Sequence, residues 1–171
     1  MTETKATLRC QLIPIEGDKL ILPNTSIAEV IIYAEPELVE GAPAWLLGRL
    51  SWRDRSIALV SFEGAAGQAL PGSNPRAKIV VINALGGNAE INFFAVVTQG
   101  LPQLLMIDEG KIAAISNENE TGQLILSRVV VNGEPAIIPD MDALEGMLLA
   151  CKKTWMKHTK KAKPATLQTS A

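Results

Sequence analysis

The sequence has a single histidine, His158, and this scarcity excludes most familiar catalytic and metal sites. His158 lies among lysines near the C-terminus, without an acid to orient it or further ligands to share a metal. No phosphate-binding loop is present either, because Gly64-Ala65-Ala66-Gly67 is followed by neither a Lys-Ser/Thr pair nor a helical pattern. We therefore expect no enzyme activity, no cofactor and no bound metal.

Cysteine and long apolar runs are also scarce. Cys10 and Cys151 are far apart in the sequence and are expected to be free, buried thiols in a reducing cytoplasm. The first five residues are polar and resemble no signal peptide. No apolar run approaches the roughly 18 residues that a membrane span needs. These absences predict a soluble cytoplasmic protein without direct membrane insertion.

Aromatic residues make up only 4% of the chain, fewer than base-stacking proteins usually carry. The net charge of −2 conceals an asymmetry, since the six lysines after Cys151 have no acid among them and leave −8 for residues 1–151. An acidic body does not attract nucleic acid. Residues 151–171 are expected to be the basic end of a helix followed by a flexible tail, which is either solvated or in contact with an acidic partner.

What the chain does contain is a series of short β-branched runs separated by turn residues. Three hairpins are predicted, over residues 8–22 around Gly17-Asp18, around Gly86-Gly87-Asn88, and around Asn132-Gly133, which is a strong hairpin signature. A single helical turn is expected over residues 41–48, and a loop that crosses between lobes over residues 64–75. Further strands are expected at residues 27–33, 56–62, 78–82, 91–97, 104–107 and 112–115, with loops at 86–88 and 117–122.

Helical periodicity appears only late in the sequence. Asp140 is a candidate helix cap, and apolar residues then recur at helical spacing from Leu144 to Trp155. Many short strands followed by one helix predict a mostly all-β fold of barrels or sandwiches.

Two stretches resemble the CheW-like proteins of bacterial chemosensory arrays. Ile27-Ala28-Glu29-Val30 resembles the family's V-x-E-V strand, and residues 42–63 resemble its Pro-containing turn, L-x-G-L-I-N-x-R-G motif and following apolar strand. The closing residues 129–149 resemble the family's last hairpin and helix. The resemblance covers roughly residues 6–150 and is nearest to divergent pilus-associated members such as ChpC.

The resemblance implies two intertwined SH3-like five-stranded β-barrel lobes with a C-terminal helix. Lobe one is expected at about 16–77 and lobe two at about 78–140, with some strand exchange. It also implies a chemosensory adaptor that couples a methyl-accepting chemotaxis receptor to the regulatory domain of a CheA-type histidine kinase, with twitching motility driven by type IV pili as one output. The chain departs from the family pattern at Asp54, Ala58 and Ser61.

Glu29 and Arg53 are the leading candidates for partner binding. A glutamate in an apolar strand needs a partner, and Arg53 offers a bidentate donor. The resemblance implies that these residues lie close together and shape the receptor-facing surface. The pair is interpreted either as a structural ion pair or as a direct partner contact.

Other candidates lie nearby in the sequence. Strand alternation places Trp52 and Asp54 on the face opposite Arg53, and we expect Trp52 to be more exposed than Trp45. Apolar residues are expected either to line a groove for a helical receptor tip or to fill the core; they are Leu22, Ile27, Val30 and Phe62.

Two other classes of function stay open. One is a β-barrel that binds a small molecule in an apolar cavity with convergent polar groups. The other is an oligonucleotide-binding barrel that uses the lysine tail.

Overall fold

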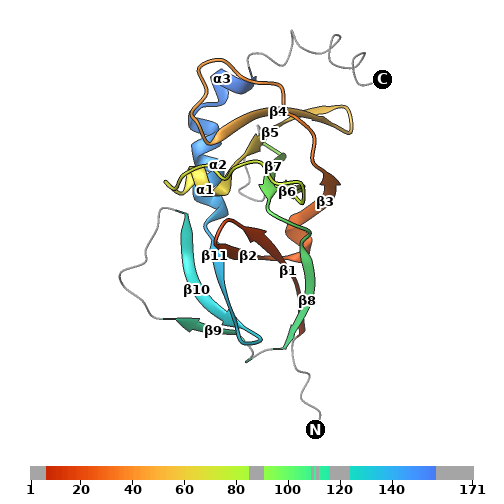
Figure 1. Ribbon diagram of the computed structural model, residues 1–171, viewed down its shortest axis with the longest axis vertical. Coiled ribbons are helices and arrows are strands. Elements are labelled where there is room, and N and C mark those ends of the chain that lie inside the picture. Colours follow the sequence, from red (N-terminus) through yellow and green to blue (C-terminus); the bar gives the residue numbers. More distant parts are fainter. Residues whose placement is uncertain (1–6, 85–90, 109, 111, 116–123, 157–171) are drawn as a thin grey trace.

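The computed structural model describes residues 7–84, 91–108, 110, 112–115 and 124–156, and strands dominate this part of the chain. The described strands form two hydrogen-bonded sheets, stacked along the long axis of the molecule (Figure 1). We call them the terminal sheet, built from both ends of the chain, and the central sheet, built from its middle. The predicted mostly-β, two-lobed fold is confirmed.

The terminal sheet has six described strands in the order β8-β1-β2-β11-β10-β9. All neighbouring strands pair antiparallel except β11 and β2, which run parallel. The predicted hairpin at the start of the chain is confirmed as the β1–β2 pair. The strands are β1 (Thr7–Ile15), β2 (Asp18–Pro23), β8 (Gln103–Asp108), β9 (Ile112–Ile115), β10 (Ile125–Val131) and β11 (Glu134–Pro139).

The central sheet has five described strands in the order β3-β6-β7-β5-β4, so β3 and β4 are its two edges. The hairpin pairs β4–β5 and β6–β7 are antiparallel, whereas β5 and β7 run parallel. The strands are β3 (Ile27–Ile32), β4 (Leu46–Trp52), β5 (Arg55–Val60), β6 (Lys78–Asn83) and β7 (Phe93–Thr98). A 3-10 turn, η1 (Asn24–Ser26), joins the terminal sheet to β3.

Both sheets combine strands from the two sides of the expected lobe boundary near residue 77. Strands β6 and β7 follow that boundary but complete the central sheet, while β2 precedes it and belongs to the terminal sheet. The terminal sheet also has six strands where five were expected. Strand exchange between the halves was expected, but its extent depends on long-range pairing, which the order of strands in a sequence does not reveal.

Two predictions of local structure are confirmed in detail. Asn132 and Gly133 have φ values of 51° and 83°, as the tight β10–β11 hairpin turn requires. Asp140 caps helix α2 (Met141–Ala150), since its side chain accepts a hydrogen bond of 3.0 Å from the backbone N–H of Ala143.

Three other local predictions are wrong. Residues 41–48 form no helical turn. The backbone N–H of Leu46 donates a hydrogen bond to the Pro43 carbonyl and closes one isolated turn, which does not continue as a helix because Leu46 begins β4. The strand expected at 56–62 ends at Val60, because the Ser61 hydroxyl caps a short helix, α1 (Phe62–Ala65). The loop expected to cross between lobes at 64–75 begins after α1. It connects β5 to β6, and both strands belong to the central sheet.

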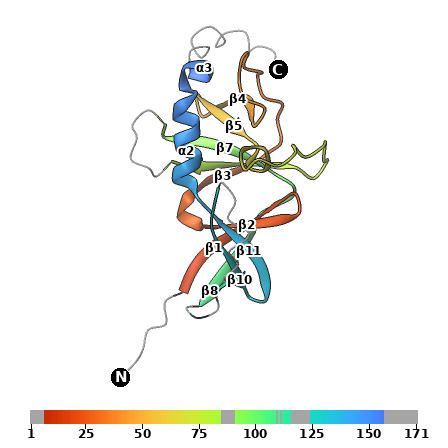
Figure 2. The same cartoon turned by 90° about the vertical axis from the view of Figure 1, so that its left-hand side faces the viewer.

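Apolar side chains form a core inside each sheet and a third, larger core between them. Helix α2 and the following α3 (Lys152–Met156) supply this shared core with Leu144, Leu148 and Trp155, which are buried. Figure 2 shows α2 beside the central sheet, continuing directly from β11 of the terminal sheet. The two sheets therefore pack as one unit.

Several predictions lie outside the described residues. These are His158, the lysine tail over 157–171, the loop at 86–88 and the polar loop at 117–122. The strands that flank the first loop, β6 and β7, do pair as a hairpin.

Candidate partner-binding site

The two edges of the central sheet are linked by side chains at one end. The Oε1 atom of Glu29 on β3 accepts a hydrogen bond of 2.9 Å from Trp52 Nε1 on β4. The same atom lies 3.1 Å from Arg53 Nη2 in the turn that follows β4. Since β3 and β4 share no backbone ladder, these side-chain contacts join the two edges where the sheet curls back on itself. We call the line between β3 and β4 the seam. The predicted pairing of Glu29 with Arg53 is observed.

The turn that presents Arg53 has an unusual backbone. Trp52 pairs directly with Arg55, so Arg53 and Asp54 are the two central residues of the β4–β5 hairpin. Their φ values of 47° and 61° lie in the left-handed region, which non-glycine residues seldom adopt. Asp54, which replaces the family's usual glycine, therefore holds the conformation that this turn needs. Strand alternation does not extend to Arg53 and Asp54, so that prediction is wrong.

Aromatic and basic side chains stack behind this turn. The rings of Trp52 and Phe93 are 4.9 Å apart and inclined at 57°, a favourable tilted arrangement. The guanidinium carbon of Arg53 lies 4.7 Å from the Trp52 ring centre, and that of Arg55 lies 4.9 Å from the Phe93 ring centre. Each ring thus carries one arginine, at a distance typical of cation–π contacts. We call Glu29, Trp52, Arg53, Arg55 and Phe93 the hairpin cluster.

The cluster has an accessible outer layer and a buried inner layer. The side chains of Arg53 and Glu29 are 64% and 40% exposed, so solvent and a partner can reach the ion pair. Trp52 is only 6% exposed, whereas Trp45 is half-buried against the shared core. The prediction that Trp52 is the more exposed tryptophan is therefore wrong, because its side chain points into the sheet and lies under Arg53.

The remaining candidates divide between the surface and the core. Asp54 is exposed at the tip of the hairpin, and Ile27 and Val30 are half-buried against the shared core. Leu22 and Phe62 are buried within that core, which is the second of the two roles considered for them. These last two side chains line no open groove.

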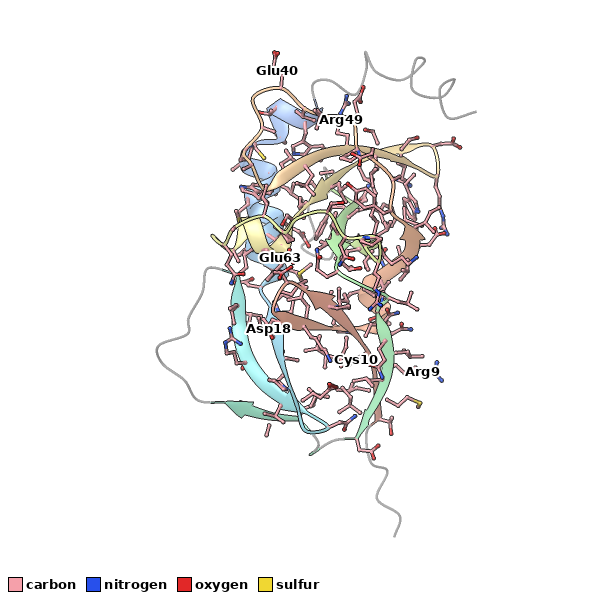
Figure 3. The ribbon with its side chains drawn as sticks, in the orientation of Figure 1. Arg9, Cys10, Asp18, Glu40, Arg49 and Glu63 are labelled. Atoms are coloured by element: carbon pink, nitrogen blue, oxygen red, sulfur yellow. The ribbon has the colours of Figure 1, made fainter. Side chains whose placement is uncertain are left out.

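A second fastening of the same seam was not predicted. Arg49 on β4 is buried and forms an ion pair with Glu37, and the backbones of the two residues exchange hydrogen bonds of 2.9 Å (Figure 3 labels Arg49). Gly48 permits this close approach, since a Cβ there would lie 2.4 Å from the Glu37 carbonyl oxygen. The glycine within the motif is the sequence feature that indicates this contact.

The cysteines lack the surroundings of reactive thiols. Burial raises the pKa of Cys10 and, as the larger of two influences, that of Cys151, so both stay protonated at neutral pH. Cys10 is buried as predicted, and Cys151 is half-buried. Among the described residues, no three His, Cys, Asp or Glu side chains are grouped to hold a metal. No described helix is long and apolar enough to cross a membrane.

Comparisons with known proteins identify the family. The model of the CheW-like domain matches residues 9–146. The crystal structure of the scaffolding protein TtCheW from Thermoanaerobacter tengcongensis is similar, with a TM-score of 0.67 and 13% sequence identity, over 78% of this chain and 89% of that chain. No curated protein matches the sequence. The structural likeness shows the shared fold, and because the family model spans most of the sequence, this chain belongs to the CheW-like domain family.

Proposed function

We propose that this chain is a non-catalytic scaffold that couples the cytoplasmic tip of a chemotaxis receptor to a CheA-type histidine kinase. The observation that carries the proposal is the accessible Glu29–Arg53 ion pair, held over the buried Trp52 ring at the hairpin end of the central sheet. This pair occupies the two positions that the family resemblance assigns to the receptor-facing surface. Signal would pass through the geometry of the assembly, with no chemical step on this chain.

The physical form of the site suits a protein partner. An arginine that is pre-positioned on an aromatic ring loses little side-chain freedom on binding, and Arg and Trp are enriched among residues that dominate binding energy. A stable interface with each partner would bury on the order of 1,000 Å² or more in total. Ile27 and Val30, on the same strand as Glu29, pack against the shared core instead.

The departures from the family pattern affect this surface at one position only. Ala58 and Ser61 are buried, and the Ser61 hydroxyl is engaged as a helix cap, so neither can touch a partner directly. Asp54 is exposed between Arg53 and Arg55. We therefore propose that Asp54 adjusts partner choice. We also propose that the partners belong to a pilus-associated chemosensory system.

A binding assay with purified receptor tip and kinase regulatory domain tests the proposal. Arg53→Ala and Glu29→Ala should each weaken receptor binding about tenfold while lowering the unfolding free energy by only about 1 kcal/mol, because the pair is partly exposed. Lys19→Ala is the matched control, since Lys19 and Glu134 form a comparably exposed ion pair of 2.9 Å on the terminal sheet. Failure of the folded wild-type protein to bind either partner would refute the proposal.

A further inference from the structure

A cavity of about 490 Å³ lies at the other end of the central sheet, away from the hairpin cluster. Leu47, near the start of β4, and Val97, near the end of β7, form part of its lining. Trp52 and Phe93 occupy the opposite ends of these same two strands. The residues around Leu70 and Pro71, in the loop before β6, also line the cavity. Its volume is within the range of about 300–1,000 Å³ that is usual for small-molecule sites.

The cavity lining carries negative charge without a compensating cation. Glu35 and Glu63 both line it, and no lysine, arginine or histidine does so among the described residues. Glu63 is only 1% exposed, and Figure 3 shows it at the level where the two sheets meet. A buried carboxylate without an opposite charge is unfavourable, which makes this environment attractive to a cation.

The hydrogen bonds of Glu63 leave part of its capacity unused. Its carboxylate accepts a bond of 2.7 Å from the backbone N–H of Glu16 and one of 3.2 Å from the Ser61 hydroxyl. A carboxylate has about four acceptor positions. Glu63 forms no ion pair with any residue in the described part of the chain. These two bonds leave the negative charge of the Glu63 carboxylate without a compensating cation beside the cavity.

The outer part of the cavity offers a second acid and an aromatic ring. Burial and the nearby Glu35 carboxylate raise the pKa of Tyr33, so its hydroxyl stays neutral at physiological pH. Tyr33 and Glu35 are both exposed and both line the cavity. A tyrosine ring attracts a cation to its face, and a neighbouring carboxylate strengthens the attraction.

One wall of the cavity is fixed before any ligand arrives. The side-chain amide of Asn74 donates bonds of 3.0 Å to both the backbone oxygen and the side-chain oxygen of Gln99, just beyond β7. Asn74 also accepts a bond of 2.8 Å from the backbone N–H of Arg76. These bonds hold the loop before β6 against the end of the sheet, which lowers the entropy lost on binding.

From this arrangement we infer that the cavity binds a guanidinium or ammonium group carried on an apolar stem. The stem packs on Leu47 and Val97, while the cationic group pairs with the exposed Glu35 and is attracted by the buried charge of Glu63. The inference is independent of the proposed scaffold function, because it uses neither the hairpin cluster nor any partner of it.

Titration of the ¹⁵N-labelled protein with agmatine, followed by NMR, tests the inference. Saturable shifts should appear at the amides of Leu47, Ala77 and Val97, and the neutral compound n-butylurea should produce none. Glu35→Gln should weaken agmatine binding by about threefold to fivefold, the range for a partly exposed charge pair. Glu40→Gln, which removes an exposed acid that does not line the cavity, should leave the affinity unchanged. Glu35→Gln is preferred to Glu63→Gln, because the buried Glu63 carboxylate also accepts a hydrogen bond from the backbone of Glu16.

A second titration distinguishes a partner's side chain from a free amine. A capped Ala-Arg-Ala tripeptide should bind as well as agmatine if the natural occupant is an arginine of another protein. It should bind more weakly than agmatine if the occupant is a free cation; either result supports a cation site. Equal shifts with butylurea, or equal affinities of wild type and Glu35→Gln for agmatine, would overturn the inference.

Discussion

The two ends of the central sheet are completed in opposite ways. At the hairpin end, Trp52 and Phe93 fill the interior and two arginines cover their rings. At the loop end, a cavity remains with two carboxylates in its lining. One sheet thus offers a filled, arginine-rich end and a hollow, acidic end. The comparison teaches that one barrel-like sheet can present a charge-balanced surface at one end and an acidic surface at the other.

Truncating an aromatic residue should give the largest difference between the two ends. We expect Trp52→Ala to lower the unfolding free energy by about 3–5 kcal/mol, because it removes a buried ring, two stacking contacts and the Glu29 hydrogen bond. Tyr33→Ala, at the hollow end, should lower it by about 1 kcal/mol or less, because the ring is 39% exposed. Urea unfolding followed by far-UV circular dichroism measures both values. Equal losses would show that the hairpin end is not the better packed one.

A methyl group at Gly48 should disturb the second fastening of the seam. We expect Gly48→Ala to lower the unfolding free energy by about 2 kcal/mol or more, since the new Cβ would collide with the backbone at Glu37 and φ is 152°. Gly72→Ala is the control, because open space surrounds that glycine in the cavity loop. The midpoints of thermal unfolding report the difference, and a Gly48→Ala midpoint equal to wild type would contradict this account of the seam.

The smallest expected effect concerns the two tight hairpin turns. Asp54→Gly should raise stability by about 0.5–1 kcal/mol, because glycine adopts the left-handed φ of 61° without steric penalty. The reverse change at the corresponding turn of the terminal sheet, Gly133→Asp, should lower stability by a similar amount, since φ there is 83°. Urea midpoints of the two variants should move in opposite directions. A loss of stability in Asp54→Gly would mean that the aspartate side chain supports the turn.

Local patterns in the sequence were sufficient for most of the strands, though not for β4, and for one of these turns. Asn132-Gly133 is recognised because both residues tolerate positive φ, whereas Arg53-Asp54 adopts the same geometry without that composition. Missing the second turn led directly to the wrong placement of Trp52. The Glu29–Arg53 pairing was predicted because an acid in an apolar strand needs a counter-charge and because the resemblance supplied the partner.

Features that depend on contacts between distant segments could not be predicted from local patterns in the sequence. The assignment of β6 and β7 to the central sheet rests on pairing with β3 and β5, whose paired residues are 36 or more positions away in the sequence, and no local pattern encodes that choice. The cavity was missed for the same reason, since Tyr33, Leu47, Glu63 and Asn74 come from separate segments that only the fold brings together.

The positions of the terminal-sheet strands along the chain determine the order in which the two sheets can be completed during synthesis. All five strands of the central sheet lie between Ile27 and Thr98, so it can be completed while the rest of the chain is still being translated. The β1–β2 hairpin is synthesised before the other described strands, yet its neighbour β11 becomes available only after Pro139 has been added. The hairpin therefore waits for its last partner, and chaperones would meet its apolar face during that interval.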